Sequence, residues 1–209
     1  MAKTGRRPGR PDTRGEIVAA AARCFARAGY DATSMRQVAA DAGVDPALVR
    51  RFFGGKEELF TEVASALIDP GSVVAAVTAG PADQAGQRLL RHFLGLLGEV
   101  RQPGPLLGLV RSAVISEHAA HMLRTFLAER VLGGIAEALH ADQGELRTAL
   151  TASQLVGIVV ARYAVRLAPL AAADDDQLVG WVGPVLQYYL TGDVQPSAPG
   201  SCVASTRRR

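Results

Sequence analysis

Apolar side chains recur every three or four residues along most of the chain, which is the spacing of α-helices that bury one face. The first helix is predicted to begin at Thr13, because Thr13 and Glu16 stand at the spacing of a capping box. Its apolar positions run from Ile17 to Ala28, and Gly29 is expected to end it in a left-handed conformation.

Two short helices are predicted next. Ser34 begins the first with another capping box, and Gly43 ends it. Asp45 and Pro46, an N-cap followed by a proline at the first helical position, begin the second, which runs to about Phe53.

A fourth helix is expected from Lys56 to the Asp69-Pro70 pair, and longer helical patterns without strand alternation follow it. The sequence therefore predicts an all-α protein of about nine helices. The longer helices are expected at about residues 83–99, 104–115, 117–140, 143–167 and 174–191.

These patterns divide the chain into four parts. Residues 1–11 are rich in Arg, Gly and Pro, and residues 193–209 have no periodic apolar positions, so both segments are expected to be disordered. Between them we expect a three-helix N-terminal domain within residues 12–68 and a larger helical domain over residues 69–192.

Composition is typical of a folded protein, since 48% of the 209 residues are hydrophobic and 21% are charged. The longest uncharged run, residues 177–192, contains Pro184 and is shorter than the roughly 20 apolar residues that cross a bilayer. No signal peptide is apparent, and Cys24 and Cys202 lack disulfide or metal-ligand spacing. We therefore expect a reduced cytoplasmic protein without a membrane segment.

The net charge of +3 is distributed unevenly. Residues 1–68 hold eleven Lys and Arg against eight Asp and Glu, whereas residues 69–206 hold nine against twelve. Arg207, Arg208 and Arg209 then add three positive charges, for which the sequence gives no role. This asymmetry suggests a polyanion-binding N-terminal part on a neutral or acidic body.

The segment from Met35 to Gly54 has the spacing of a helix-turn-helix. Its two helices meet at Gly43, with the small Ala39 before the corner and the apolar Val49 after it. The alternative is a three-helix scaffold whose arginines are simply exposed to solvent. We disfavour this alternative because the helix caps, the turn and the basic arm all indicate a helix-turn-helix. The side chains expected to face the DNA major groove are Pro46, Ala47, Leu48, Arg50 and Arg51.

Residues 12–68 resemble the DNA-binding domain of the TetR family of transcriptional regulators. Residues 106–114, 153–163 and 186–192 resemble the ligand-binding and dimerisation domain of one actinobacterial branch. The resemblance implies a homodimeric, ligand-responsive repressor of a palindromic operator, with activation as the alternative. It rests on Thr13-Arg14, Phe25, Gly29-Tyr30, Thr33-Ser34, Val38-Ala39, Ala42-Gly43-Val44, Phe53 and Lys56-Glu57-Glu58-Leu59-Phe60.

The resemblance also implies DNA contacts. This sequence departs from the family pattern at two positions. Arg50 stands where the family usually has tyrosine, and Phe52 stands where it usually has histidine. We expect Arg50 to bind a phosphate or a guanine and Phe52 to pack inward. The residues that match base-contacting positions are Arg36, Pro46, Ala47 and Leu48, and those that match phosphate-contacting positions are Ser34, Arg50 and Lys56.

The N-terminal arm contains a further candidate. Arg10, within Pro8-Gly9-Arg10-Pro11, resembles the core of an AT-hook, which inserts an arginine into a narrow minor groove. A solvated basic tail that attracts all DNA equally is an alternative of the same weight. Deletion of residues 2–11 distinguishes them, because a uniform loss of affinity favours the tail.

A dimer is expected because one short recognition helix reads too few base pairs to find a site in a genome. The predicted helices 143–167 and 174–191 are apolar around much of their circumference, and the resemblance implies a four-helix bundle between two copies. Packing within one chain is the alternative explanation. The expected dimer residues are Leu155, Val159, Val182, Leu186 and Tyr189.

The resemblance further implies a pocket for an unknown small-molecule effector between the helices of the larger domain. We expect more of the candidate residues to belong to the core than to contact a ligand. The candidates are Phe93, Leu97, Leu107, Val110, Met122, Phe126 and Gly157, with Arg111 and Gln154 as polar anchors.

Other classes of function receive less support. Gly54-Gly55-Lys56 lacks the Ser or Thr and the earlier glycine of a phosphate loop, and no hydrolase or dinucleotide motif is present, so no enzyme and no cofactor is expected. His118 and His121 provide too few ligands for zinc, so we expect an exposed helix face and no metal site. A nonspecific architectural DNA-binding protein remains the third possibility.

Overall fold

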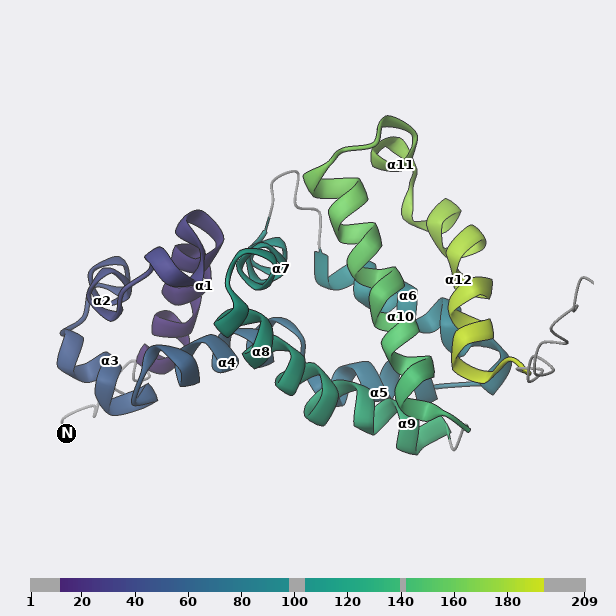
Figure 1. Ribbon diagram of the computed structural model, residues 1–209, viewed down its shortest axis with the longest axis horizontal. Coiled ribbons are helices and arrows are strands. Elements are labelled where there is room, and N and C mark those ends of the chain that lie inside the picture. The colour runs from purple at the N-terminus through teal and green to yellow at the C-terminus, as the bar shows by residue number, and fades with distance from the viewer. Residues whose placement is uncertain (1–11, 98–103, 140–141, 194–209) are drawn as a thin grey trace, which may run out of the picture.

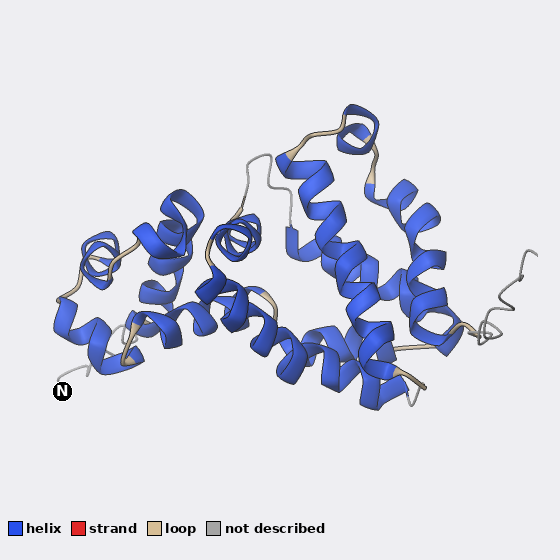
Figure 2. Ribbon diagram, in the orientation of Figure 1, coloured by secondary structure: helices blue, strands red, loops and turns tan. Residues whose placement is uncertain are grey.

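The computed structural model describes residues 12–97, 104–139 and 142–193, and every regular element within these ranges is helical (Figure 2). Figure 1 shows α1–α4 at one end of the molecule, α5, α6 and α9–α12 at the other, and α7 and α8 between them. We call α1–α4 the head and α5–α12 the body. The predicted all-α fold is thus confirmed.

The elements of the head are α1 (Thr13–Ala32), α2 (Met35–Ala42), α3 (Pro46–Phe53) and α4 (Lys56–Leu67). Those of the body are α5 (Pro70–Thr78), η1 (Ala82–Gln84), α6 (Ala85–Leu97), α7 (Pro105–Ile115), α8 (Glu117–Phe126), η2 (Leu127–Leu132), α9 (Gly133–Leu139), α10 (Gly144–Val159), η3 (Val160–Ala164), α11 (Ala168–Ala172) and α12 (Asp175–Thr191).

The predicted arm and tail, residues 1–11 and 193–209, lie outside the described residues apart from Asp193. Two short helices, α5 and α11, were not predicted. The signal for α5 is present, because Asp69 accepts hydrogen bonds from the main-chain N–H of Gly71 at 3.3 Å and of Ser72 at 3.1 Å ahead of a first-position proline. The predicted helices 117–140 and 143–167 each contain a π-helical segment, η2 and η3.

The head is closed by an aromatic cluster. The rings of Phe25, Tyr30 and Phe60 lie with centroids 5.2–5.8 Å apart, two of the three pairs edge to face. Leu59 and Val49 are fully buried beside them. Burial raises the pKa of Tyr30 to about 12, and the nearby Glu57 carboxylate contributes to this shift. The phenol therefore stays neutral at physiological pH.

Helix α1 differs from the prediction at both ends. Its N-cap is Asp12, whose carboxylate accepts from Gly15 N–H at 3.0 Å, in place of Thr13. At Gly29 the backbone has a φ of 79° and a ψ of 173°, so the helix kinks there and continues to Ala32. Glycine is required at this φ because a side chain would be strained.

In the body, α6 and α12 cross at two glycines. A Cβ atom on Gly86 would collide with the main chain of Gly183 and Gln187. The Gln187 side chain accepts from Gly86 N–H at 2.9 Å and donates to the Ala82 carbonyl at 2.8 Å. The contact therefore depends on the absence of side chains and on one amide that joins the two helices.

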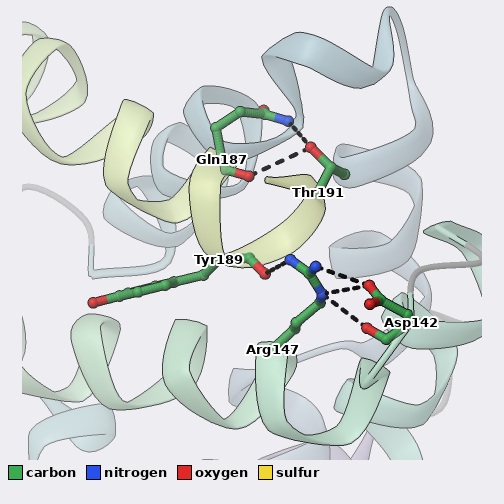
Figure 3. A network of polar contacts seen from close by, with 5 residues as sticks. All are labelled: Asp142, Arg147, Gln187, Tyr189 and Thr191. Atoms are coloured by element: carbon green, nitrogen blue, oxygen red, sulfur yellow. Dashed lines mark hydrogen bonds and ion pairs between the residues drawn. The ribbon is translucent and has the colours of Figure 1, made fainter. Parts of the chain in front are cut away.

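Arg147 joins α10 to the end of α12 (Figure 3). Its side chain is 7% exposed, donates to Asp142 Oδ1 at 2.8 Å and 3.2 Å, and donates to the Tyr189 carbonyl at 3.1 Å. Because buried arginines need such partners, this network fixes the C-terminal turn of α12 against the N-terminal turn of α10. These two helices lie side by side in Figure 1.

The stretch Lys56–Thr78 has the length and a mean hydropathy, 1.3, that would allow it to cross a membrane. In the structure it is divided at Ile68, whose φ of −127° and ψ of 82° are not helical. Leu59, Phe60 and Val77 are buried within the protein. These three side chains thus form part of the protein core.

Candidate nucleic-acid interface and its connection to the body

The corner between α2 and α3 has the geometry of a helix-turn-helix. Gly43 adopts a left-handed conformation with a φ of 66° and a ψ of 30°, and Val44 N–H donates to the Ala39 carbonyl at 3.0 Å. Val38 and Val49, on the two sides of the corner, are at most 1% exposed. Because every one of these features is local in sequence, the register of α3 relative to α2 follows from the residues themselves.

The exposed face of α3 carries two cations. Asp45 accepts from Ala47 N–H at 2.7 Å and so begins the helix, and Arg50 and Arg51 lie in its last turn. Most of the residues predicted to contact DNA are exposed. The exposed ones are Ser34, Arg36, Pro46, Ala47, Arg50 and Arg51, whereas Leu48 and Lys56 are half-buried. Arg10 lies outside the described residues.

Phe52 does not pack inward as expected. It is 43% exposed and lies beside a groove between head and body that also contains Glu58 and Phe126. The inward position in the last turn of α3 belongs to Phe53, which is 4% exposed. The helical period alone did not separate these neighbours, because both are large and aromatic.

Lys56 joins the start of α4 to the end of α1. Its ammonium donates to the main-chain carbonyls of Tyr30 and Thr33, both at 3.1 Å, and lies 4.2 Å from the centroid of the Tyr30 ring. An ammonium has three donors, so one remains for another acceptor. Lys56 therefore has a structural role that the sequence did not indicate.

Helix α7 contacts the head directly. The guanidinium of Arg111 donates to the carbonyls of Ala26 and Arg27 at 2.7 Å and 3.1 Å, just before the kink in α1. A Cβ atom on Gly108 would lie 2.5 Å from Ala26 Cα, so the two helices touch along their main chains. Arg111, predicted to anchor a ligand, instead caps the end of the straight part of α1.

The start of α8 makes two further contacts with the head. The Ser116 hydroxyl, which accepts from Ala119 N–H, lies 3.1 Å from Asp31 Oδ1. His118 Nε2 lies 2.9 Å from Glu57 Oε1, so the predicted exposed histidine has an acidic partner on α4. Among the residues that the structure describes, no group of three or more His, Cys, Asp or Glu side chains could hold a metal ion.

A cavity of about 90 Å³ lies within the body. It is lined by residues of α5–α10 and by Ile68, and nearly all of them are apolar. Phe93 and Val110 are the two predicted effector contacts that reach it.

The other predicted effector contacts lie elsewhere. Leu97 and Leu107 line a separate cavity of about 50 Å³, whereas Met122 and Phe126 face the groove between head and body. Gln154 and Gly157 are not among the residues that line the described cavities.

Comparisons with known proteins place this arrangement in a family. Residues 17–63 match the family described as bacterial regulatory proteins, tetR family. Residues 83–190, more than half of the chain, match the tetracyclin repressor-like C-terminal domain. The chain belongs to the TetR family of transcriptional regulators. It is therefore a DNA-binding regulator, and the resemblance seen in the sequence is confirmed.

Several solved structures of regulators have a similar fold. A TetR-family regulator from Streptomyces coelicolor A3 is 37% identical, with a TM-score of 0.56 over 89% of this chain and 98% of that one. A putative TetR-family regulator from Mesorhizobium loti MAFF303099 is 22% identical, with a TM-score of 0.59 over 85% and 95%. The fatty acid degradation regulator FadR from Bacillus halodurans is 18% identical, with a TM-score of 0.59 over 87% and 100%. A comparison with curated proteins gives no match.

Most of the residues that were predicted to form a TetR-type dimer are buried or partly buried within a single chain. Val159 and Leu186 are at most 1% exposed, Leu155 lines the cavity, and Val182 and Tyr189 are half-buried. The same two helices expose other apolar side chains, which we call the α10–α12 patch. It consists of Leu146 (56% exposed), Leu150 (39%), Trp181 (83%), Val185 (40%) and Tyr188 (55%).

Proposed function

We propose that this TetR-family protein is a homodimeric repressor that binds a palindromic operator in the cytoplasm and releases it when a small molecule enters the body. The observation that carries the proposal is the position of α7. Val110 of this helix lines the cavity, and its neighbour Arg111 is hydrogen-bonded to the head. A ligand in the cavity would therefore contact the same helix that is hydrogen-bonded to the head, the part that we assign to DNA.

Recognition of DNA is assigned to α3 and the start of α2. We assign Arg51, Arg36 and the apolar residues at the start of α3 to base edges, and Arg50 and Ser34 to phosphates. The third donor of Lys56 adds a phosphate contact. Arg10, in the arm that precedes α1, adds a minor-groove or nonspecific contact. These apolar residues are Pro46, Ala47 and Leu48.

Dimerisation is assigned to the α10–α12 patch. Its five large apolar side chains lie on two adjacent helices, and exposed clusters of this kind mark interaction sites. A second copy that packs the same patch in two-fold symmetry forms a four-helix bundle. Half-buried Val182 and Tyr189 would lie at its edge, whereas Val159 and Leu186 support it from inside each chain.

The switch requires a ligand with different affinities for two positions of α7. A ligand that binds both positions equally shifts nothing, however tightly it binds. One that favours a displaced α7 would move the end of α1 through Gly108 and Arg111, and so change the separation of the two α3 helices. Bound ligand then lowers the affinity of the protein for DNA by a certain factor, and bound DNA lowers its affinity for the ligand by the same factor.

Selection of duplexes from a random DNA pool tests the proposal with the full chain. We expect enrichment of an inverted repeat whose half-sites lie about one helical turn apart, and at least about 1,000-fold preference over random duplex. Equal affinity for selected and random DNA would instead identify an architectural protein. Transcription in vitro from a promoter that overlaps the selected site separates repression, the expected result, from activation.

A further inference from the structure

We infer that the effector is a compact, uncharged, apolar molecule of about the size of one aromatic ring, bound in the cavity of the body. This inference rests on the proposed ligand response and specifies the chemical class of the ligand. The cavity volume of about 90 Å³ is of the same order as that of an engineered apolar cavity, about 150 Å³, that stays dry and binds benzene.

The walls of the cavity are almost entirely hydrocarbon. They include Leu89 and Phe93 of α6, Leu109 of α7, Ile135 of α9 and Val159 of α10, which meet from elements far apart in the sequence. No Asp, Glu, Lys or Arg side chain is among its lining residues. The two expected polar anchors, Arg111 and Gln154, are not among the lining residues, and Arg111 Nη2 donates to α1 instead.

The two polar side chains of the lining are already bonded to the protein. Thr151 Oγ1 donates to the Arg147 carbonyl at 2.9 Å. His92 Nε2 lies 3.2 Å from the Ser72 hydroxyl, which itself donates to the Asp69 carbonyl at 2.8 Å. When that hydroxyl gives its one hydrogen to Asp69, it accepts from His92 Nε2–H. The Thr151 hydroxyl and His92 Nε2 are therefore both engaged with the protein.

An ion in this cavity would lose its hydration without gaining a partner. Transfer of an unpaired carboxylate or ammonium into such surroundings costs several kcal/mol, whereas a neutral ring gains from leaving water. The walls therefore select against charge of either sign. A molecule much larger than one ring would have to displace side chains that are already packed.

One segment of the wall also has an irregular backbone. Leu127, Val131 and Leu132 belong to η2, the π-helical segment between α8 and α9. Single π-helical turns within α-helices occur frequently at functional sites, where the extra residue shifts side chains out of register. Here the shifted register presents three apolar side chains to one cavity.

Three probes of matched shape test the inference by isothermal titration calorimetry on the full chain. Toluene is neutral, benzoate is an anion and benzylammonium is a cation. We expect saturable binding of toluene, and binding of the two ions that is weaker by about 100-fold or more. Equal or tighter binding of either ion overturns the inference, and so does the absence of toluene binding.

Two alanines on α10 provide a matched pair of variants. Ala152 lines the cavity, whereas Ala149 is exposed on the same helix. We expect Ala152→Leu to abolish toluene binding with no loss of melting temperature, and Ala149→Leu to leave binding unchanged. Toluene binding that Ala152→Leu leaves intact would overturn the assignment to this cavity.

Release of the selected operator by toluene separates this inference from the proposed function. Toluene that binds in the cavity and weakens operator binding supports both. Toluene that binds there, is blocked by Ala152→Leu, and leaves operator affinity unchanged supports the chemistry of the site and overturns the proposed switch.

Discussion

Arg111 donates a hydrogen bond to the main-chain carbonyl of Ala26 at 2.7 Å, although the two residues are 85 positions apart in the sequence. The bond joins α7 of the body to the last straight turn of α1 in the head. Since Val110 lines the cavity, consecutive residues of α7 contact the two parts that the proposed switch must couple.

Replacement of Arg111 by alanine should loosen this connection. We expect Arg111→Ala to lower the free energy of unfolding by about 1 kcal/mol, because two hydrogen bonds from an exposed guanidinium are lost. The ratio of operator affinities with and without a cavity ligand should fall toward one. Urea unfolding and fluorescence anisotropy measure the two effects. Arg124→Ala, which breaks an exposed pair with Glu117, is the control; an unchanged ratio in Arg111→Ala would contradict the coupling.

Lys56 should affect both stability and DNA binding. Loss of its bonds to Tyr30 and Thr33 is expected to reduce the free energy of unfolding of Lys56→Ala by about 1–3 kcal/mol. Loss of its remaining donor should lower the slope of log affinity against log salt by about 1. Lys56→Met keeps the apolar stem and separates charge from packing. A slope that neither variant changes would remove Lys56 from the phosphate contacts.

Ser112 is an example of a stabilising change that the structure suggests. It is 1% exposed, and its hydroxyl has no hydrogen-bond partner. We expect Ser112→Ala to raise the free energy of unfolding by about 1 kcal/mol, since a buried, unpaired hydroxyl is removed. Thr148→Val is the control: its hydroxyl bonds to the Gly144 carbonyl at 2.7 Å, so this variant should be less stable than the original. The opposite order in chemical denaturation would show that Ser112 is satisfied in solution.

The sequence predicted the head better than the body, for a physical reason. The caps at Ser34 and Asp45 and the turn at Gly43 involve residues within a few positions of one another. By contrast, α10 and α12 are apolar on several sides, so helical period could not separate buried Leu186 from exposed Trp181.

The effector contacts show the same limit. An arginine in an apolar helix suggests a polar anchor inside a pocket, but its direction depends on how α7 packs against α1. Arg111 thus faces the head, whereas Val110 faces the cavity. Val73, which α5 contributes to the cavity wall, was also missed, because this short helix is mostly apolar and has no clear helical period to detect.

Arg51 and Arg50 should have different effects on DNA binding. We expect Arg51→Ala to cost about 1–3 kcal/mol and to relax preference at one base pair of each half-site, because a base contact is lost. Arg50→Ala should weaken all sequences alike and reduce the salt dependence, as expected for a phosphate contact. Anisotropy titrations with the selected operator and single-base variants measure both. Uniform weakening by Arg51→Ala would assign it to the backbone as well.

Trp181 should decide the oligomeric state. It is the single tryptophan of the chain, is 83% exposed, and is followed one turn later on α12 by the exposed Val185. We expect Trp181→Glu to convert a dimer to a monomer in light scattering, because two carboxylates would be buried across the two-fold axis. In the original protein, tryptophan emission should shift to longer wavelength on dilution through the dissociation range. Ile115→Glu, at a 74% exposed apolar site on α7, is the control and should remain dimeric. A Trp181→Glu protein that stays dimeric would place the interface on another surface.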